Sequence, residues 1–102
     1  MIAMNVTRLN LSAADMTRHI QKLAEKTEKV FFTKHALDRM EERRVTTEHV
    51  FTCLQKGNVF EIPFCNVRGE WECNVIRQVA GLETEIAVRV KLDEKILIIT
   101  VI

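Results

Sequence analysis

The residues best suited to chemistry lie in one short segment, in which His35, Arg39, Glu42 and Arg43 follow the spacing i, i+4, i+7 and i+8. At ~100° per residue, their side chains fall within an arc of roughly 100° on one helix face. An imidazole there could move a proton, and two guanidiniums could bind a phosphate. The carboxylate could orient the imidazole or act as a base. The same residues could equally form a salt-bridged helix surface, so both interpretations stay open.

Length and charge restrict what the chain can be. Its 102 residues are 47% hydrophobic and include one proline, which indicates a single domain with its own core. The net charge of +1 argues against a strongly basic nucleic-acid-binding protein. Residues 1–57 hold ten Lys and Arg against seven Asp and Glu, whereas residues 58–102 hold five against seven. We therefore expect any anion-binding surface in the N-terminal half.

The cysteine pattern predicts reduced thiols and no metal. The chain has an odd number of cysteines, Cys53, Cys65 and Cys73, and no two of them have CxxC spacing. Reduced, unpaired thiols of this kind are common in cytosolic proteins. A zinc site would have to combine His35 or His49 with two of these cysteines, and none of those pairs has finger-like spacing. We expect neither a metal nor another cofactor.

The chain shows no targeting or membrane segment. Its first fifteen residues include Asn5, Arg8 and Asp15 and contain no continuous apolar stretch. The longest apolar run, 96–99, is far too short to cross a bilayer. We expect a cytoplasmic protein that does not bind membranes.

Helical periodicity governs the first half of the chain. Ser12 and Asp15 form a capping-box-like start, and the apolar spacing that follows predicts a helix over residues 13–28. Thr33 is the expected N-cap of a helix over 34–43. Its buried stripe is expected to contain Ala36, Leu37 and Met40.

A third helix is expected after Thr46, which is suited to cap it. Val50, Phe51 and Leu54 form its apolar stripe, and Gly57 is expected in the left-handed conformation that ends many helices.

The second half alternates with the period of β-strands. The segments expected to be extended are 30–32, 58–62, 70–78, 84–92 and 96–102. The short turns between the later segments predict an antiparallel meander. The last segment is apolar on both faces, which predicts an interior strand covered by the N-terminal helix or by a second subunit. The expected fold class is α+β, with two to three N-terminal helices packed on a four- to five-stranded antiparallel sheet.

Two helical stretches resemble one known family. The first runs from His35 to Arg43 and continues with Val45 and Thr47-Glu48, and the second ends in Leu54-Gln55-Lys56-Gly57. Together with 98–101, they resemble the domain of unknown function 4258 family, which is similar to BrnT-like toxins of the RelE/ParE-type fold. The resemblance covers roughly residues 30–102 and leaves 1–29 as an N-terminal helical addition.

The resemblance implies a RelE/BrnT-like core within one domain over residues 1–102. It implies a toxin-like, metal-independent ribonuclease of a bacterial or phage toxin–antitoxin or mobile-element system. An antitoxin-like protein partner would hold the enzyme inactive. The chain departs from the toxin pattern because its C-terminal strands lack a run of basic residues. It also carries Arg44 where the family usually has glycine.

Ribonuclease chemistry without a metal needs a proton-transfer group and cations beside the phosphate. On this interpretation His35 transfers the proton, Arg39 and Arg43 bind the phosphate, and Glu42 assists. The expected catalytic residues are His35, Arg39 and Glu42, and the expected substrate-binding residues are Arg43, Arg77, Arg89 and Lys91.

The alternative is a non-catalytic module that binds a protein partner on the same scaffold. The near-neutral charge and the apolar last strand favour it, and that strand could also support a homodimer. A plain RNA- or DNA-binding domain fits the charge balance least well.

Overall fold

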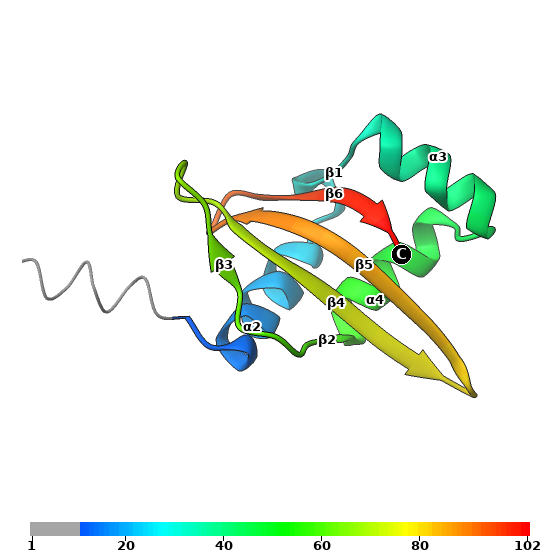
Figure 1. Cartoon of the computed structure of the whole chain (residues 1–102), viewed down its shortest axis with the longest axis horizontal. Coiled ribbons are helices and arrows are strands. Elements are labelled where there is room, and N and C mark those ends of the chain that lie inside the picture. Colours follow the sequence, from blue (N-terminus) through cyan, green and yellow to red (C-terminus); the bar gives the residue numbers. More distant parts are fainter. Residues whose placement is uncertain (1–10) are drawn as a thin grey trace, which may run out of the picture.

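The computed structural model describes residues 11–102, in which each of three α-helices begins at a hydroxyl side chain (Figure 1). In each case the hydroxyl oxygen accepts a hydrogen bond from the backbone amide three residues further on. The helices are α2 (Ala13–Ala24) after Ser12, α3 (Lys34–Arg43) after Thr33 and α4 (Thr47–Lys56) after Thr46. The three predicted caps are therefore confirmed.

Two expected helix ends were wrong. Helix α2 stops at Ala24 instead of residue 28, and a 3-10 helix, η1 (Thr27–Lys29), follows it. The reason is that residues 25–28 are all exposed, so nothing beyond Ala24 adds apolar burial to the helix. Gly57 adopts φ −84° and ψ −177°, which is extended and not left-handed. At the end of α3, by contrast, Arg44 does adopt the left-handed conformation, with φ 57°.

The strands form one six-stranded sheet in the order β1-β6-β5-β4-β2, and β3 also pairs with β4. The strands are β1 (Val30–Phe32), β2 (Asn58–Val59), β3 (Phe64–Cys65), β4 (Trp71–Val79), β5 (Leu82–Lys91) and β6 (Lys95–Val101). The meander of β4, β5 and β6 is antiparallel, as predicted. β1, however, runs parallel to β6, with Val30 opposite Ile96, so the sheet is mixed and the expected purely antiparallel sheet was wrong. The whole chain between these two strands serves as the long crossover that a parallel pair requires.

The extended segment expected over 58–62 is shorter than predicted. Only Asn58 and Val59 pair with β4, and pairing with β4 resumes at Phe64 in β3. Pro63 lies between them and lacks the amide that a ladder needs. The turn after β4 is a two-residue hairpin in which Ala80 and Gly81 both have positive φ.

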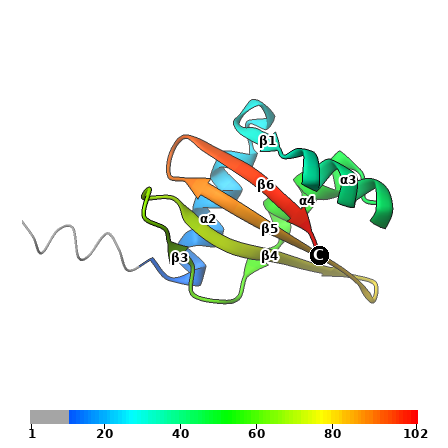
Figure 2. The same cartoon turned by 45° about the horizontal axis from the view of Figure 1, so that its top comes forward.

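Helices α2 and α4 pack on one face of the sheet, and the core lies between them and the inward side chains of β4, β5 and β6 (Figures 1 and 2). β6 lies between β1 and β5, so the prediction that the last strand is an interior strand is confirmed. Ile96 and Ile98 are fully buried. A register shift opposite Ala87 and Val88 turns Val101 back into the core. None of the helices in residues 11–102 has the length and apolar character that a membrane crossing requires.

Candidate functional site

Helix α3 is held against the end of β6 by its N-cap. The Thr33 hydroxyl lies 3.0 Å from the carbonyl oxygens of both Ile98 and Ile99, and the Thr33 amide donates to the Ile98 carbonyl. Ala36 and Met40 face the core, as expected. Leu37 was expected in the same buried stripe, but it is 49% exposed, so this part of the prediction was wrong. The junction with β6 therefore decides which face of α3 meets solvent.

Arg39 is the most constrained member of the predicted catalytic set. Its Nε donates to the carbonyl oxygen of Val101 over 3.3 Å, and its Nη1 lies 3.4 Å from Glu42 Oε1. The Arg39 side chain is 31% exposed, against 62% for Glu42. Two different partners thus orient the guanidinium, and its remaining N–H groups are left for a further acceptor.

His35 and Arg43 lie on the same helix face as Arg39, one turn before it and one turn after it. Both are exposed, and within residues 11–102 neither side chain makes a hydrogen bond or an ion pair. Asp38, an alternative partner for these arginines, pairs with Lys34 instead, at 3.1 Å. The α3 face, defined by His35, Arg39, Glu42 and Arg43, therefore presents an imidazole and two guanidiniums beside one carboxylate.

The basic residues of β5 do not join the α3 face. Lys91 pairs with Glu94 at 3.5 Å and lies opposite Lys95, at the start of β6. Arg39 contacts Val101, at the other end of that strand. The six residue steps from Lys95 to Val101 correspond to ~20 Å of extended chain. The structure therefore places Lys91 away from the predicted catalytic residues.

Arg89 is engaged on the sheet itself. Its Nε lies 3.5 Å from a carboxylate oxygen of Glu72, its cross-strand neighbour, and 3.9 Å from one of Glu70. Asn66 holds both carboxylates through its side-chain amide. Two carboxylates thus neutralise the Arg89 charge, which leaves it poorly suited to bind a phosphate.

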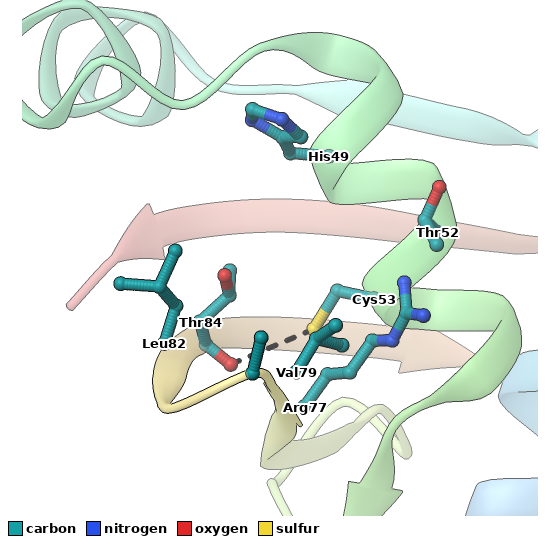
Figure 3. Close-up of a pocket in the computed structure, with 8 residues that line it drawn as sticks. His49, Thr52, Cys53, Arg77, Val79, Leu82 and Thr84 are labelled. Atoms are coloured by element: carbon teal, nitrogen blue, oxygen red, sulfur yellow. Dashed lines mark hydrogen bonds between the residues drawn. The ribbon is translucent and has the colours of Figure 1, made fainter.

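Arg77 lies on the helix-covered face of β4. There it lines a cavity with Thr52 and Cys53 of α4 (Figure 3). Of the four residues predicted to bind substrate, only Arg43 therefore lies on the α3 face with the predicted catalytic residues.

Comparison with known families agrees with the signature of α3 and α4. The family described as Domain of unknown function (DUF4258) matches residues 32–102. The chain belongs to this family. The match begins in β1, includes every predicted site residue and leaves α2 outside. No curated protein and no solved structure matches the chain.

Two cysteines of this DUF4258 chain, Cys53 and Cys73, are poor candidates for thiolate chemistry. Burial raises the pKa of Cys53 to about 11, although the nearby charge of Arg77 acts in the opposite direction. Burial also raises the pKa of Cys73 to about 12. Both groups therefore stay protonated near neutral pH. Within residues 11–102, no three His, Cys, Asp or Glu side chains are grouped so that they could hold a metal ion.

The cavity beside Arg77 was missed by the sequence reasoning, although a signal for it exists. Trp71, Cys73 and Val75 alternate on the inward face of β4, and the same alternation places Arg77 on that face. A charged side chain in such a series is unusual and points to a polar opening in the core face. His49, which also lines the cavity, caps α4 by accepting a hydrogen bond from the Thr46 amide through Nδ1.

Proposed function

We propose that this DUF4258 chain is a toxin-like, metal-independent ribonuclease whose site is the α3 face. One observation carries the proposal. Arg39 is oriented by Val101 and Glu42, while His35 and Arg43 flank it on the same face without partners in residues 11–102. A preorganised guanidinium between a second guanidinium and an imidazole suits a phosphodiester.

Phosphate binding falls to the two arginines. Residues one helical turn apart have Cβ atoms about 5–6 Å from each other, so Arg39 and Arg43 can reach one phosphate together. The N-terminal turn of α3, which carries His35, also favours an anion through the positive end of the helix dipole. Both features support a binding site for the scissile phosphate between His35 and Arg43.

Cleavage then needs one proton removed and one supplied. His35 takes the proton of the ribose 2′-hydroxyl, and that oxygen attacks the phosphorus while the bond to the 5′-oxygen breaks. The leaving oxygen takes a proton from water, which gives a 2′,3′-cyclic phosphate and a 5′-hydroxyl. Arg39 and Arg43 stabilise the added negative charge, and Glu42 holds Arg39 in place. An antitoxin-like protein would block this face.

The test is cleavage of RNA by the purified chain in EDTA, with and without ribosomes. We expect wild type to cut and His35→Ala to lose activity by about a hundredfold or more, the usual contribution of a proton-transfer group. Arg43→Ala is expected to weaken RNA binding, and added salt should weaken it further. Lys34→Ala is the matched control, since Lys34 is exposed on the same helix but pairs with Asp38.

Two results would overturn the ribonuclease proposal. One is a folded wild-type chain that leaves RNA intact in both settings. The other is a His35→Ala variant that cuts at the wild-type rate, since the proton transfer would then belong to another group.

A second candidate function is protein binding, and the segment between β2 and β4 favours it. Phe60, Ile62, Phe64 and Val67 are all exposed here, and the least exposed of them, Phe64, is still 63% exposed. The short strand β3 pairs only with β4, so this segment borders the sheet. Large exposed apolar side chains beside a sheet edge are typical of interaction sites.

Apolar side chains define the partner that this edge would take. Glu61 lies within the segment, whereas Glu70 and Glu72 beside it already pair with Arg89. We infer a protein partner that offers mainly apolar side chains. A double Phe60→Ser, Phe64→Ser variant should lose that partner in a pull-down while His35→Ala keeps it. A partner retained by the serine variant would exclude this edge.

A further inference from the structure

A cavity of about 360 Å³ opens between α4 and the β4–β5 hairpin, away from the α3 face (Figure 3). Thr52 and Cys53 of α4 line one wall, and Arg77, Val79, Leu82 and Thr84 of the hairpin line the other. This volume lies at the lower end of the ~300–1,000 Å³ typical of small-molecule sites. The cavity is therefore large enough for a small ligand.

Arg77 is the permanently charged side chain in this lining. Its guanidinium points toward α4, near Thr52 and Cys53 (Figure 3). Within residues 11–102 it forms no ion pair and no side-chain hydrogen bond, in contrast to Arg89 on the neighbouring strand. A guanidinium placed against the core face without a carboxylate keeps its donors free for an anionic ligand.

A second cavity of about 350 Å³ adjoins the first and shares Arg77 and Val79 with it. Its other polar lining residues are Lys56, Asn58 and Gln78. Lys56, in the last turn of α4, also has no ion pair within the described part of the chain. Two cations, Arg77 and Lys56, thus line the second cavity, and neither makes an ion pair within residues 11–102.

Away from Arg77, the hairpin wall of the first cavity is mainly apolar. Val79, at the boundary of the two cavities, is 49% exposed, and Leu82, on the side away from Arg77 and across from His49, is 77% exposed (Figure 3). The site thus has a cationic end and an apolar end.

We propose that the two adjoining cavities form a binding site for a small organic anion with an apolar tail. Arg77 and Lys56 hold the anionic group, and Val79 and Leu82 cover the tail. The site is independent of the ribonuclease proposal, since no residue of α3 lines either cavity.

The test is a titration of the chain followed by amide chemical shifts, with three probes that separate the two ends of the site. Octanoate offers both a carboxylate and an apolar chain, octanol offers the chain alone, and inorganic phosphate offers the charge alone. We expect octanoate to shift the amides of Thr52, Cys53 and Leu82 in a saturable way. Octanol and phosphate should each bind at least about tenfold more weakly, because each lacks half of the contacts.

Variants then test whether Arg77 binds the carboxylate of octanoate. Arg77→Met should weaken octanoate binding by about tenfold or more and leave octanol binding unchanged. Arg68→Met is the matched control, because Arg68 is exposed and lines neither cavity. Equal binding of octanol and octanoate would overturn the proposal, as would octanoate binding that Arg77→Met leaves unchanged. Failure of octanoate to shift these amides at millimolar concentration would overturn it as well.

Discussion

Arg39 on α3 donates its Nε hydrogen to the carbonyl oxygen of Val101, in the last residue of β6. The two residues are 62 positions apart in sequence, so this contact joins the signature helix to the final strand. The same arginine belongs to the proposed phosphate site. Loss of activity in an Arg39 variant would therefore combine a weaker fold with a lost phosphate contact, so stability and RNA cleavage must be measured separately.

The first prediction concerns this contact. Arg39→Met should lower the free energy of unfolding by about 1 kcal/mol, since it removes the shorter of two side-chain hydrogen bonds to the Val101 carbonyl and the pairing with Glu42. The other bond to that carbonyl comes from the Thr100 hydroxyl. Arg43→Met on the same face should change stability by less than about 0.5 kcal/mol, as is usual for exposed residues. Urea denaturation of both variants is the measurement. Equal losses in the two variants would show that the contact adds nothing to stability.

The Thr33 hydroxyl caps α3 and also contacts carbonyl oxygens of β6, so its removal should lower the stability of the fold. Thr33→Val removes the hydrogen bond from the Ala36 amide and the contacts with the Ile98 and Ile99 carbonyls. We expect a loss of about 1–2 kcal/mol, whereas Thr33→Ser, which keeps the hydroxyl, should lose much less. Thermal unfolding followed by circular dichroism compares them. A serine variant as unstable as the valine variant would contradict this explanation.

Gly57 should be intolerant of alanine for a steric reason. A Cβ there would lie 2.5 Å from the Cys53 carbonyl oxygen and 2.8 Å from the Ile76 carbonyl oxygen, and both are backbone atoms. Gly57→Ala should therefore cost about 2–3 kcal/mol in the free energy of unfolding. Gly69→Ala meets nothing within 4 Å and should cost only about 1 kcal/mol, because its φ is +80°. Urea denaturation gives both values, and the reverse order would refute the steric argument.

Alkaline pH should destabilise the fold through two buried thiols. The pKa of Cys53 rises from 9.0 to about 11 and that of Cys73 from 9.0 to about 12. A group whose pKa is raised in the folded state contributes its full stability below the unfolded value. That contribution is lost as the pH rises from about 9 through the folded values.

The measurement is urea denaturation at pH 8 and pH 10.5. A Cys53→Ala, Cys73→Ala variant should lose less stability between the two pH values than wild type does. If the variant and wild type lose the same amount, other groups are responsible for the alkaline instability.

Most of the local structure could be predicted from the sequence. Capping hydroxyls at Ser12, Thr33 and Thr46 act through the next turn of chain, so neighbouring residues suffice to recognise them. The alternation of apolar and polar residues along β5 likewise predicts which face of the strand is buried. The end of α2 and the conformation of Gly57 were mispredicted, because they depend on what packs beside them.

The candidate site was predictable only in part. The spacing from His35 to Arg43 placed the four side chains of the α3 face together, since one helix carries them all. The arginines of β4 and β5 were expected beside them and are not there. Their positions depend on strand register and on the Glu70–Glu72 pair that holds Arg89, which are long-range properties.

The sequence alone thus determined where the helices begin, which strand faces are apolar and which residues share the face of α3, because these follow from spacing along a single element. Tertiary structure alone decided that β1 pairs in parallel with β6, that Arg39 reaches Val101, and that Arg77 and Lys56 line the same cavity. These features join residues far apart in the chain. Only the packing of the whole domain selects such contacts from the many that local pattern allows.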